Sequence, residues 1–129
     1  MRDLSALPNL NIALVQTSLA WHDRQANLDH FELLLEQARG ADLIILPEMF
    51  TTGFSMESAT LAEPENGPTH RWLQAQAAKY GAVITGSVII QAADGSHRNR
   101  LLWARPDGEV MHYDKRHLFR MAGEHEHYT

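Results

Sequence analysis

The chain has 129 residues, enough for one domain with a single hydrophobic core and too few to expect two. Hydrophobic residues make up 44% of the sequence, charged residues 21%, and the formal net charge is −5, so we expect a globular domain with no nucleic-acid partner. No apolar run approaches the roughly 20 residues of a membrane helix, and the N-terminus lacks the apolar segment of a secretory signal, so we expect a cytoplasmic protein with no membrane partner.

The first part of the chain predicts a strand followed by a helix. Residues 1–9 are polar, and we expect them to form a loose N-terminal arm. Residues 10–16 are rich in β-branched side chains over the length of a strand. Asp23 then stands where a helix N-cap belongs, apolar residues follow at helical spacing, and Gly40 marks the end of that helix. Because its apolar stripe is one-sided, this helix should pack against one face of a sheet.

The same series of elements repeats in the next part of the chain. Residues 42–46 form an apolar run closed by a proline, which is typical of a strand buried on both faces. Residues 51–67 are rich in Thr, Ser, Gly, Glu and Pro and predict a long irregular connection. Pro68 opens a second helix at the position where a missing N–H costs nothing, and Gly81 ends it. Residues 82–90 form another buried strand.

The last part of the chain has a different pattern. Turn signals at residues 94–95 and 106–108, with strand-like segments at 99–105 and 109–114, predict a meander of antiparallel strands. The predicted order is therefore strand, helix, strand, helix, strand and then hairpins. This order indicates an α/β fold with a mixed sheet and two helices on one face.

Glu48 is the first candidate for chemistry. It follows Pro47, which ends the predicted strand at residues 42–46, so its side chain is set at the carboxyl edge of the sheet. Ligands bind at that edge in open α/β sheets, and a carboxylate held there can act as a general base. Taken alone, this segment is explained at least as well by a solvated loop glutamate, because carboxylates are common at strand ends.

Lys115 is the second candidate. It lies at the end of the predicted strand at residues 109–114, among bulky side chains, and a lysine held there can stabilise an oxyanion as a fixed positive charge. The alternative is that Asp114, Lys115 and Arg116 simply form an exposed charged surface. Neither Glu48 nor Lys115 indicates catalysis without the other.

Taken together, the ordered segments resemble the nitrilase superfamily of carbon–nitrogen hydrolases. Residues 46–54 read Leu-Pro-Glu-Met-Phe-Thr-Thr-Gly-Phe after a buried strand, and residues 113–119 read Tyr-Asp-Lys-Arg-His-Leu-Phe after a hairpin. Residues 12–16, Ile-Ala-Leu-Val-Gln, match the usual opening strand of that family. The resemblance spans residues 10–129 without an obvious gap.

Within the superfamily, residues 49–54 and 115–119 look most like the omega-amidase branch. That branch is known for removing ammonia from the side-chain amide of 2-oxo acid amides such as 2-oxoglutaramate. The resemblance therefore implies a small-molecule amide substrate, such as a 2-oxo acid amide or a dicarboxylate monoamide, and no cofactor.

The resemblance also implies how the chain is organised. The complete family fold is a four-layer α-β-β-α sandwich made from two similar halves, so we expect residues 10–129 to form a truncated carbon–nitrogen hydrolase domain, the N-terminal half of that sandwich. Half of the sandwich would leave an apolar sheet face and open sheet edges uncovered. We therefore expect the isolated chain to self-associate or to form a homo-oligomer.

The family mechanism implies a role for four residues. Glu48 would be the general base and Lys115 the group that stabilises the oxyanion. A further family glutamate, which positions the substrate and supports the lysine, falls on Glu124 in preference to Glu126. Phe54 closes the segment after Glu48, and we place it near the substrate pocket.

The departure from the family is the absence of cysteine, which in the family supplies the nucleophile from an elbow beyond Lys115. Removing the nucleophile from a catalytic set that acts as a unit costs on the order of a million-fold in rate. We therefore expect the chain alone to be inactive as an amidase.

Two other functions compete with the amidase. One is a non-catalytic interaction protein that docks on an intact homologue. The other is a metal-binding module, because imidazole is a good ligand for zinc or nickel and four histidines cluster near the end of the chain, namely His112, His117, His125 and His127. No helical His-Glu-x-x-His spacing is present, so we predict no metal site.

Overall fold

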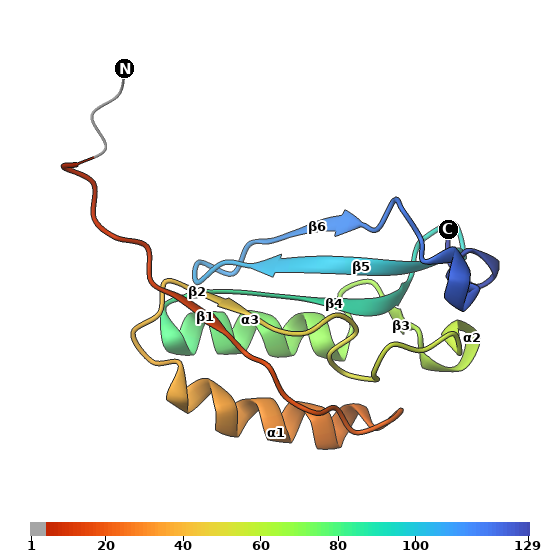
Figure 1. Ribbon diagram of the computed structural model, residues 1–129, viewed down its shortest axis with the longest axis horizontal. Coiled ribbons are helices and arrows are strands. Elements are labelled where there is room, and N and C mark those ends of the chain that lie inside the picture. Colours follow the sequence, from red (N-terminus) through yellow and green to blue (C-terminus); the bar gives the residue numbers. More distant parts are fainter. Residues whose placement is uncertain (1–4) are drawn as a thin grey trace.

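A six-stranded mixed sheet carries two long helices on one of its faces (Figure 1). The computed structural model describes residues 5–129. The strands are β1 (Ile12–Leu14), β2 (Leu43–Ile45), β3 (Glu63–Pro64), β4 (Val83–Gln91), β5 (His97–Ala104) and β6 (Val110–Asp114). The helices are α1 (Arg24–Gln37), α2 (Ser58–Leu61) and α3 (Pro68–Tyr80), followed by the short 3₁₀ turns η1 (Arg120–Ala122) and η2 (Glu124–Glu126).

The sheet combines a parallel and an antiparallel part. Its main path runs β1-β2-β4-β5-β6, and the short strand β3 pairs with β4 outside that path. Strands β1, β2 and β4 are parallel, whereas β4, β5 and β6 form an antiparallel meander. The predicted α/β fold, with a mixed sheet and two helices on one face, is confirmed.

Local sequence signals account for the two long helices. Asp23 caps α1 by accepting a hydrogen bond from the Ala26 backbone N–H at 3.0 Å. The apolar stripe of α1 is buried against the sheet, although the helix ends at Gln37, before the predicted Gly40. Helix α3 begins at Pro68 and is capped by Gly81 in the left-handed conformation, as predicted.

The predicted irregular connection at residues 51–67 is wrong in part, because it contains α2 and β3. The carboxylate of Glu63 in β3 is buried and accepts hydrogen bonds from the backbone N–H and the hydroxyl of Thr69. The N-cap of α3, Gly67, provides no side-chain cap, so Glu63 satisfies the first turn of that helix instead. This tertiary contact has no local sequence pattern.

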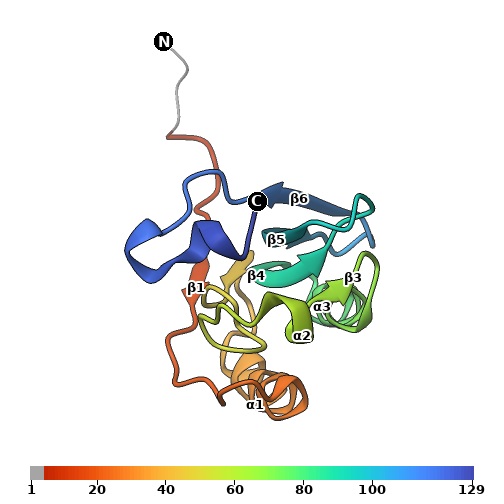
Figure 2. The same ribbon diagram turned by 90° about the vertical axis from the view of Figure 1, so that its right-hand side faces the viewer.

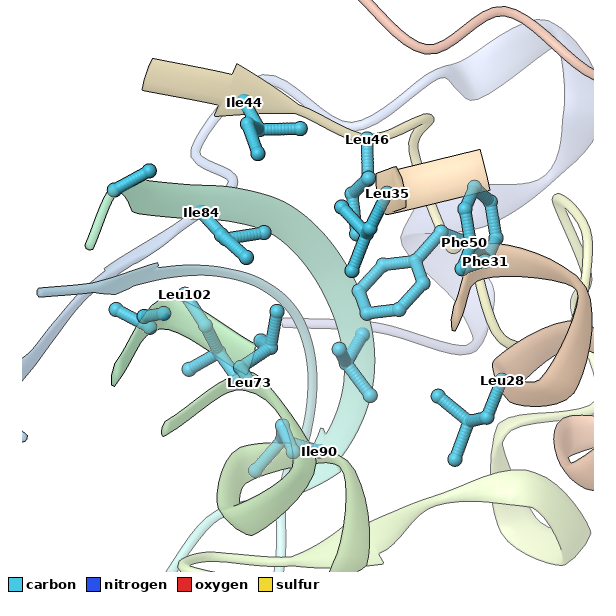
Figure 3. Packing of buried hydrophobic residues seen from close by; sticks show 14 residues of the cluster. Leu28, Phe31, Leu35, Ile44, Leu46, Phe50, Leu73, Ile84, Ile90 and Leu102 are labelled. Atoms are coloured by element: carbon cyan, nitrogen blue, oxygen red, sulfur yellow. The ribbon is translucent and has the colours of Figure 1, made fainter. Parts of the chain in front are cut away.

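The main core lies between the sheet and the helices, and Phe50 is central to it. Its ring packs edge-on against Phe31 of α1 at 5.4 Å between centroids and lies 6.0 Å from the Trp72 ring of α3. Figure 3 shows Phe31 and Phe50 side by side among the aliphatic residues of the core. Gly86 of β4 is required here, because a β-carbon at that position would lie 2.7 Å from the Phe50 ring. Phe50 thus anchors the segment that follows β2.

The opposite face of the sheet is apolar and open. Strand side chains alternate between faces, and on the outer strands β1 and β6 the apolar side chains that point away from α1 and α3 are exposed. Ile12 and Leu14 of β1 are 52% and 74% exposed, and Met111 and Tyr113 of β6 are 46% and 53% exposed. We refer to this surface as the open face.

The N-terminal arm is described only in part. Residues 5–9 are exposed and form no helix or strand, and residues 1–4 of the predicted arm lie outside the described residues. Strand β1 begins later and ends earlier than the predicted strand at residues 10–16. Among the described residues, no helix has the length and hydropathy needed to cross a membrane.

Candidate active site

Glu48 reaches the open face because the backbone turns sharply behind it. Met49 has a φ of 47°, in the left-handed region that few non-glycine residues adopt. The Met49 backbone N–H donates a hydrogen bond of 2.8 Å to the Ser87 hydroxyl on β4, which holds this conformation. The turn separates the two side chains: Met49 is fully buried, whereas the Glu48 side chain is 48% exposed.

Lys115 approaches Glu48 from the neighbouring part of the sheet. It is the first residue after β6, and its backbone N–H donates to the Asn99 carbonyl of β5 at 2.9 Å. Its ammonium Nζ donates to Glu48 Oε1 at 2.9 Å and to Glu124 Oε2 at 3.0 Å. Three residues that are far apart in the sequence therefore meet in one cluster.

Glu124 forms the buried base of this cluster. Its side chain is fully buried at the start of η2, just after Gly123, whose φ of 75° turns the chain inward. Glu124 Oε2 accepts a 2.6 Å hydrogen bond from the Phe119 backbone N–H, and Oε1 accepts one of 3.1 Å from the Asn99 side chain. A buried carboxylate needs such partners, and Glu124 has them on both oxygens.

Asn99 is a site residue that the sequence analysis missed. It is 3% exposed, and its Nδ2 also donates to Glu48 Oε1 at 2.8 Å. One signal could have found it: it is the first residue of the predicted strand at residues 99–105, and the hairpin places it opposite Lys115, with Arg100 paired to Asp114 next to it.

The charges of the cluster keep the lysine protonated. Partial burial alone would lower the pKa of Lys115, but its hydrogen bonds to Glu48 and Glu124 outweigh burial and raise that pKa above its ordinary value. Burial would likewise raise the pKa of Glu124, yet the Phe119 N–H, Lys115 and Asn99 hold it below the ordinary value. Lys115 is thus a fixed positive charge near neutral pH.

An open depression of about 280 Å³ adjoins the cluster on the open face. Glu48, Asn99 and Lys115 line one part of it, and the apolar side chains of Leu101 and Tyr113 line another. A small molecule in this depression would touch the free side of the Glu48 carboxylate and the Lys115 ammonium together.

Phe54 lies beside the lysine. Lys115 Nζ is 5.4 Å from the centre of the Phe54 ring, and that ring is 6.4 Å from the ring of Phe119. Among the described residues that line the depression, Phe54 is not included. Its predicted contact with substrate remains a prediction.

The segments that carry Glu48 and Glu124 are fastened to each other. The Tyr128 hydroxyl donates to the Ser55 carbonyl at 2.6 Å, and the Ser58 hydroxyl donates to the His127 carbonyl at 3.1 Å. Burial raises the pKa of Tyr128, with the Glu124 charge as a second cause, so its phenol stays a donor. Figure 2 shows this C-terminal segment running back over the connection between β2 and α2.

The histidines do not gather into a metal site. Among residues 5–129, no group of three or more His, Asp or Glu side chains could hold a metal ion. The structure therefore gives no support to the alternative based on His112, His117, His125 and His127.

Comparison with solved structures gives the class of this fold. Nit3 of Saccharomyces cerevisiae, a member of the nitrilase superfamily, superposes with a TM-score of 0.79 at 24% identity, over 93% of this chain and 48% of that chain. At that identity the match concerns the fold alone. The chain has the α/β fold of nitrilase-superfamily proteins.

The Carbon-nitrogen hydrolase family model matches residues 11–129, and the chain belongs to this family. A CN-hydrolase superfamily protein of Xanthomonas campestris, solved with an arsenic adduct in its active site, has a TM-score of 0.91 and 51% identity, over 95% of this chain and 46% of that one. The predicted nitrilase-superfamily membership is confirmed.

Several curated relatives are named as amidases. The omega-amidases YafV of Yersinia enterocolitica and Escherichia coli K12 are 50% and 49% identical, over 95% of this chain and 47% of each relative. A 2-oxoglutaramate amidase of Bacillus subtilis is 28% identical over 88% of this chain and 45% of that protein. The chain spans about half the length of the curated relatives it matches.

Proposed function

We propose that this chain provides the general base and the oxyanion-stabilising lysine of an omega-amidase. The substrates would be small 2-oxo acid amides or dicarboxylate monoamides. The observation that carries the proposal is the convergence of Glu48, Lys115 and Glu124 beside one open depression. The naming of the YafV relatives as omega-amidases supports the choice of substrate class.

The chemistry follows from the charges of these groups. Glu48 takes the proton of a thiol that approaches from the open face, and the thiolate attacks the amide carbon. Glu48 then gives this proton to the amide nitrogen, so that the C–N bond breaks, ammonia leaves and a thioester forms. Glu48, again a carboxylate, takes a proton from the water that attacks the thioester and returns it to the sulfur as the C–S bond breaks, which releases the acid and restores the thiol. General-base catalysis of this kind contributes about 10²–10⁴-fold in rate. The Lys115 ammonium stabilises the oxyanion of both tetrahedral species.

Glu124 and Phe54 have supporting roles in this proposal. Because Glu124 is fully buried and holds the Lys115 ammonium, it positions the substrate through that lysine. Phe54 flanks the same ammonium and shields one side of it from water. The sequence contains no cysteine, so we expect these 129 residues alone to be inactive.

A hybrid protein tests the proposal. Residues 1–129 would replace the matching segment of the E. coli relative, whose remaining segment, by the family resemblance, carries the cysteine. We expect this hybrid to release ammonia from 2-oxoglutaramate or succinamate, and residues 1–129 alone to release none above background. A folded hybrid without activity on either amide would contradict the proposal, as would enzyme-like turnover by the chain alone.

We further propose that the isolated chain, which we place in the cytoplasm, self-associates through the open face. The exposed apolar side chains of Leu14 and Met111 support this, because contiguous apolar surface favours association. Light scattering should show a species larger than a monomer, and the double variant Leu14→Lys/Met111→Lys should reduce its mass. Leu33→Lys is the matched control, since Leu33 is 72% exposed on α1 away from that face. A monomeric wild-type chain would refute the proposed self-association.

A further inference from the structure

The hydrogen bonds of Asn99 are unusual in that one amide nitrogen serves two carboxylates. Its two N–H groups donate to Glu48 Oε1 at 2.8 Å and to Glu124 Oε1 at 3.1 Å. The reversed amide would aim its oxygen at both anions, so the orientation is unambiguous. In the described part of the chain, Asn99 Oδ1 is buried without a partner. The fold therefore leaves one half of this amide unsatisfied while the other half bridges Glu48 and Glu124.

The hydrogen bonds around Glu48 show which of its two carboxylate oxygens can contact a ligand. Glu48 Oε1 accepts from both Asn99 and Lys115, whereas within residues 5–129 no hydrogen bond involves Glu48 Oε2. Lys115 Nζ has three N–H groups and donates to two carboxylates, which leaves one for a ligand in the depression. Oε2 of Glu48 and one N–H of Lys115 are thus the free reactive positions.

We propose that Asn99 is a positioning residue that keeps Glu48 Oε2 free and aimed at the substrate. The inference rests on the proposed function, because it assigns Oε2 as the atom that takes the proton. Glu48 is half-exposed, and without Asn99 its carboxylate would be repelled by Glu124 and turn toward solvent. Lys115 alone is a weaker restraint, because its stem has four rotatable bonds.

Asn99 is well suited to this role because its own position is rigid. It is nearly fully buried in β5, and its carbonyl accepts the Lys115 backbone N–H. Asn99 therefore holds Glu48 through its side chain and Lys115 through its backbone, which sets the spacing between the two. Such fixed geometry is what brings reacting groups into a productive arrangement.

The variant Asn99→Leu tests the role, because leucine keeps the side-chain volume and removes both donors. In the hybrid, we expect kcat to fall about tenfold with little change in KM, since Glu48 loses its charge-assisted hydrogen bond from Asn99.

A second measurement does not depend on activity. The sequence contains two lysines, and Lys79 provides an internal control for Lys115, because it lies on α3 beside a carboxylate outside the site, Glu36. Acetic anhydride labelling followed by mass spectrometry reports the reactivity of each amine in residues 1–129. In Asn99→Leu we expect Lys115 to be acetylated several-fold faster, because Glu48 no longer pairs with it, while Lys79 is unchanged.

The outcomes separate this inference from the amidase proposal. If the unsubstituted hybrid is inactive, the amidase proposal fails, and the labelling ratio of Lys115 to Lys79 still decides whether Asn99 holds the cluster together. If the hybrid is active but Asn99→Leu leaves kcat and the labelling ratio unchanged, the positioning role is overturned. A uniform loss of rate with an unchanged ratio would also overturn it, because that result indicates a purely structural residue.

Discussion

Strands β5 and β6 carry two charged clusters, one on each face of the sheet. The Arg100 cluster, which consists of Arg100, Asp114 and Glu65, lies on the side of the helices. The Lys115 cluster, which consists of Lys115, Glu48 and Glu124, lies on the open face. Each contains one cation and two carboxylates, and Arg100 and Asp114 are direct cross-strand partners next to Asn99 and Lys115. The difference between them lies in how far the cation is enclosed.

The Arg100 cluster encloses its cation more fully than the Lys115 cluster does. Arg100 donates Nε–H and one terminal N–H to the two oxygens of Asp114 at 2.6 and 3.1 Å, and the other terminal nitrogen donates to Glu65 at 2.9 Å. Its side chain is 9% exposed, compared with 30% for Lys115. Both cations bind two carboxylates, but Arg100 forms three hydrogen bonds to them from a more deeply buried position, whereas Lys115 forms two and lines the open depression. We interpret the first cluster as structural and the second as chemical.

The largest expected effect compares one carboxylate from each cluster. In the hybrid, Glu48→Gln should lower kcat/KM by about 10²–10⁴-fold, because it removes the general base while keeping shape and hydrogen bonding. Glu65→Gln is the matched control and should stay within about twofold, since Glu65 lies on the other face. Steady-state kinetics with 2-oxoglutaramate measure both. Equal losses for the two variants would remove the functional distinction between the clusters.

The next effect concerns stability, for which we expect the Arg100 cluster to matter more than the Lys115 cluster. Arg100→Met leaves Asp114 and Glu65 close together without their shared cation. Breaking a fully buried pair costs about 3–5 kcal/mol, but these carboxylates are partly exposed, so we expect a loss of about 2 kcal/mol. Urea unfolding of the hybrid measures the change, and activity per folded molecule should be retained. Unchanged unfolding with reduced activity would assign Arg100 to the site instead.

The same contrast explains how far the sequence could predict the structure. Helices α1 and α3 carry their own caps and apolar stripes, so local patterns were sufficient to find them. Glu48 and Lys115 follow strands and belong to recognisable segments, and the structure brings the two side chains into contact at 2.9 Å. Their catalytic roles remain proposals.

What the sequence did not reveal depends on contacts between distant residues. Asn99 resembles any polar residue at a strand end until the β5–β6 register places it opposite Lys115. Strand β3 exists only through its parallel pairing with β4, in which Glu63 lies opposite Ile90. Local propensity carries no information on such pairings, because their energy comes from tertiary partners.

The smallest effect is the response of the two clusters to alkaline pH. The pKa of Lys115 is raised in the folded chain, so its stabilisation is fully present below the unfolded pKa and is lost as pH rises through the folded pKa. Arg100 stays protonated throughout this range. Burial raises the pKa of Tyr128 as well, so a second alkaline loss of stability is expected from that phenol.

Lys115→Arg isolates the contribution of the lysine, because the Tyr128 contribution is common to both proteins and cancels in the difference. We expect the free energy of unfolding of the wild-type hybrid to decrease more than that of Lys115→Arg between about pH 9 and about pH 11, by less than about 1 kcal/mol. Urea unfolding at several pH values measures this difference. Parallel curves for the two proteins would mean that the Lys115 ammonium gains no net stabilisation from Glu48 and Glu124, and the Lys115 cluster would then not be the preformed charge arrangement that the amidase proposal requires.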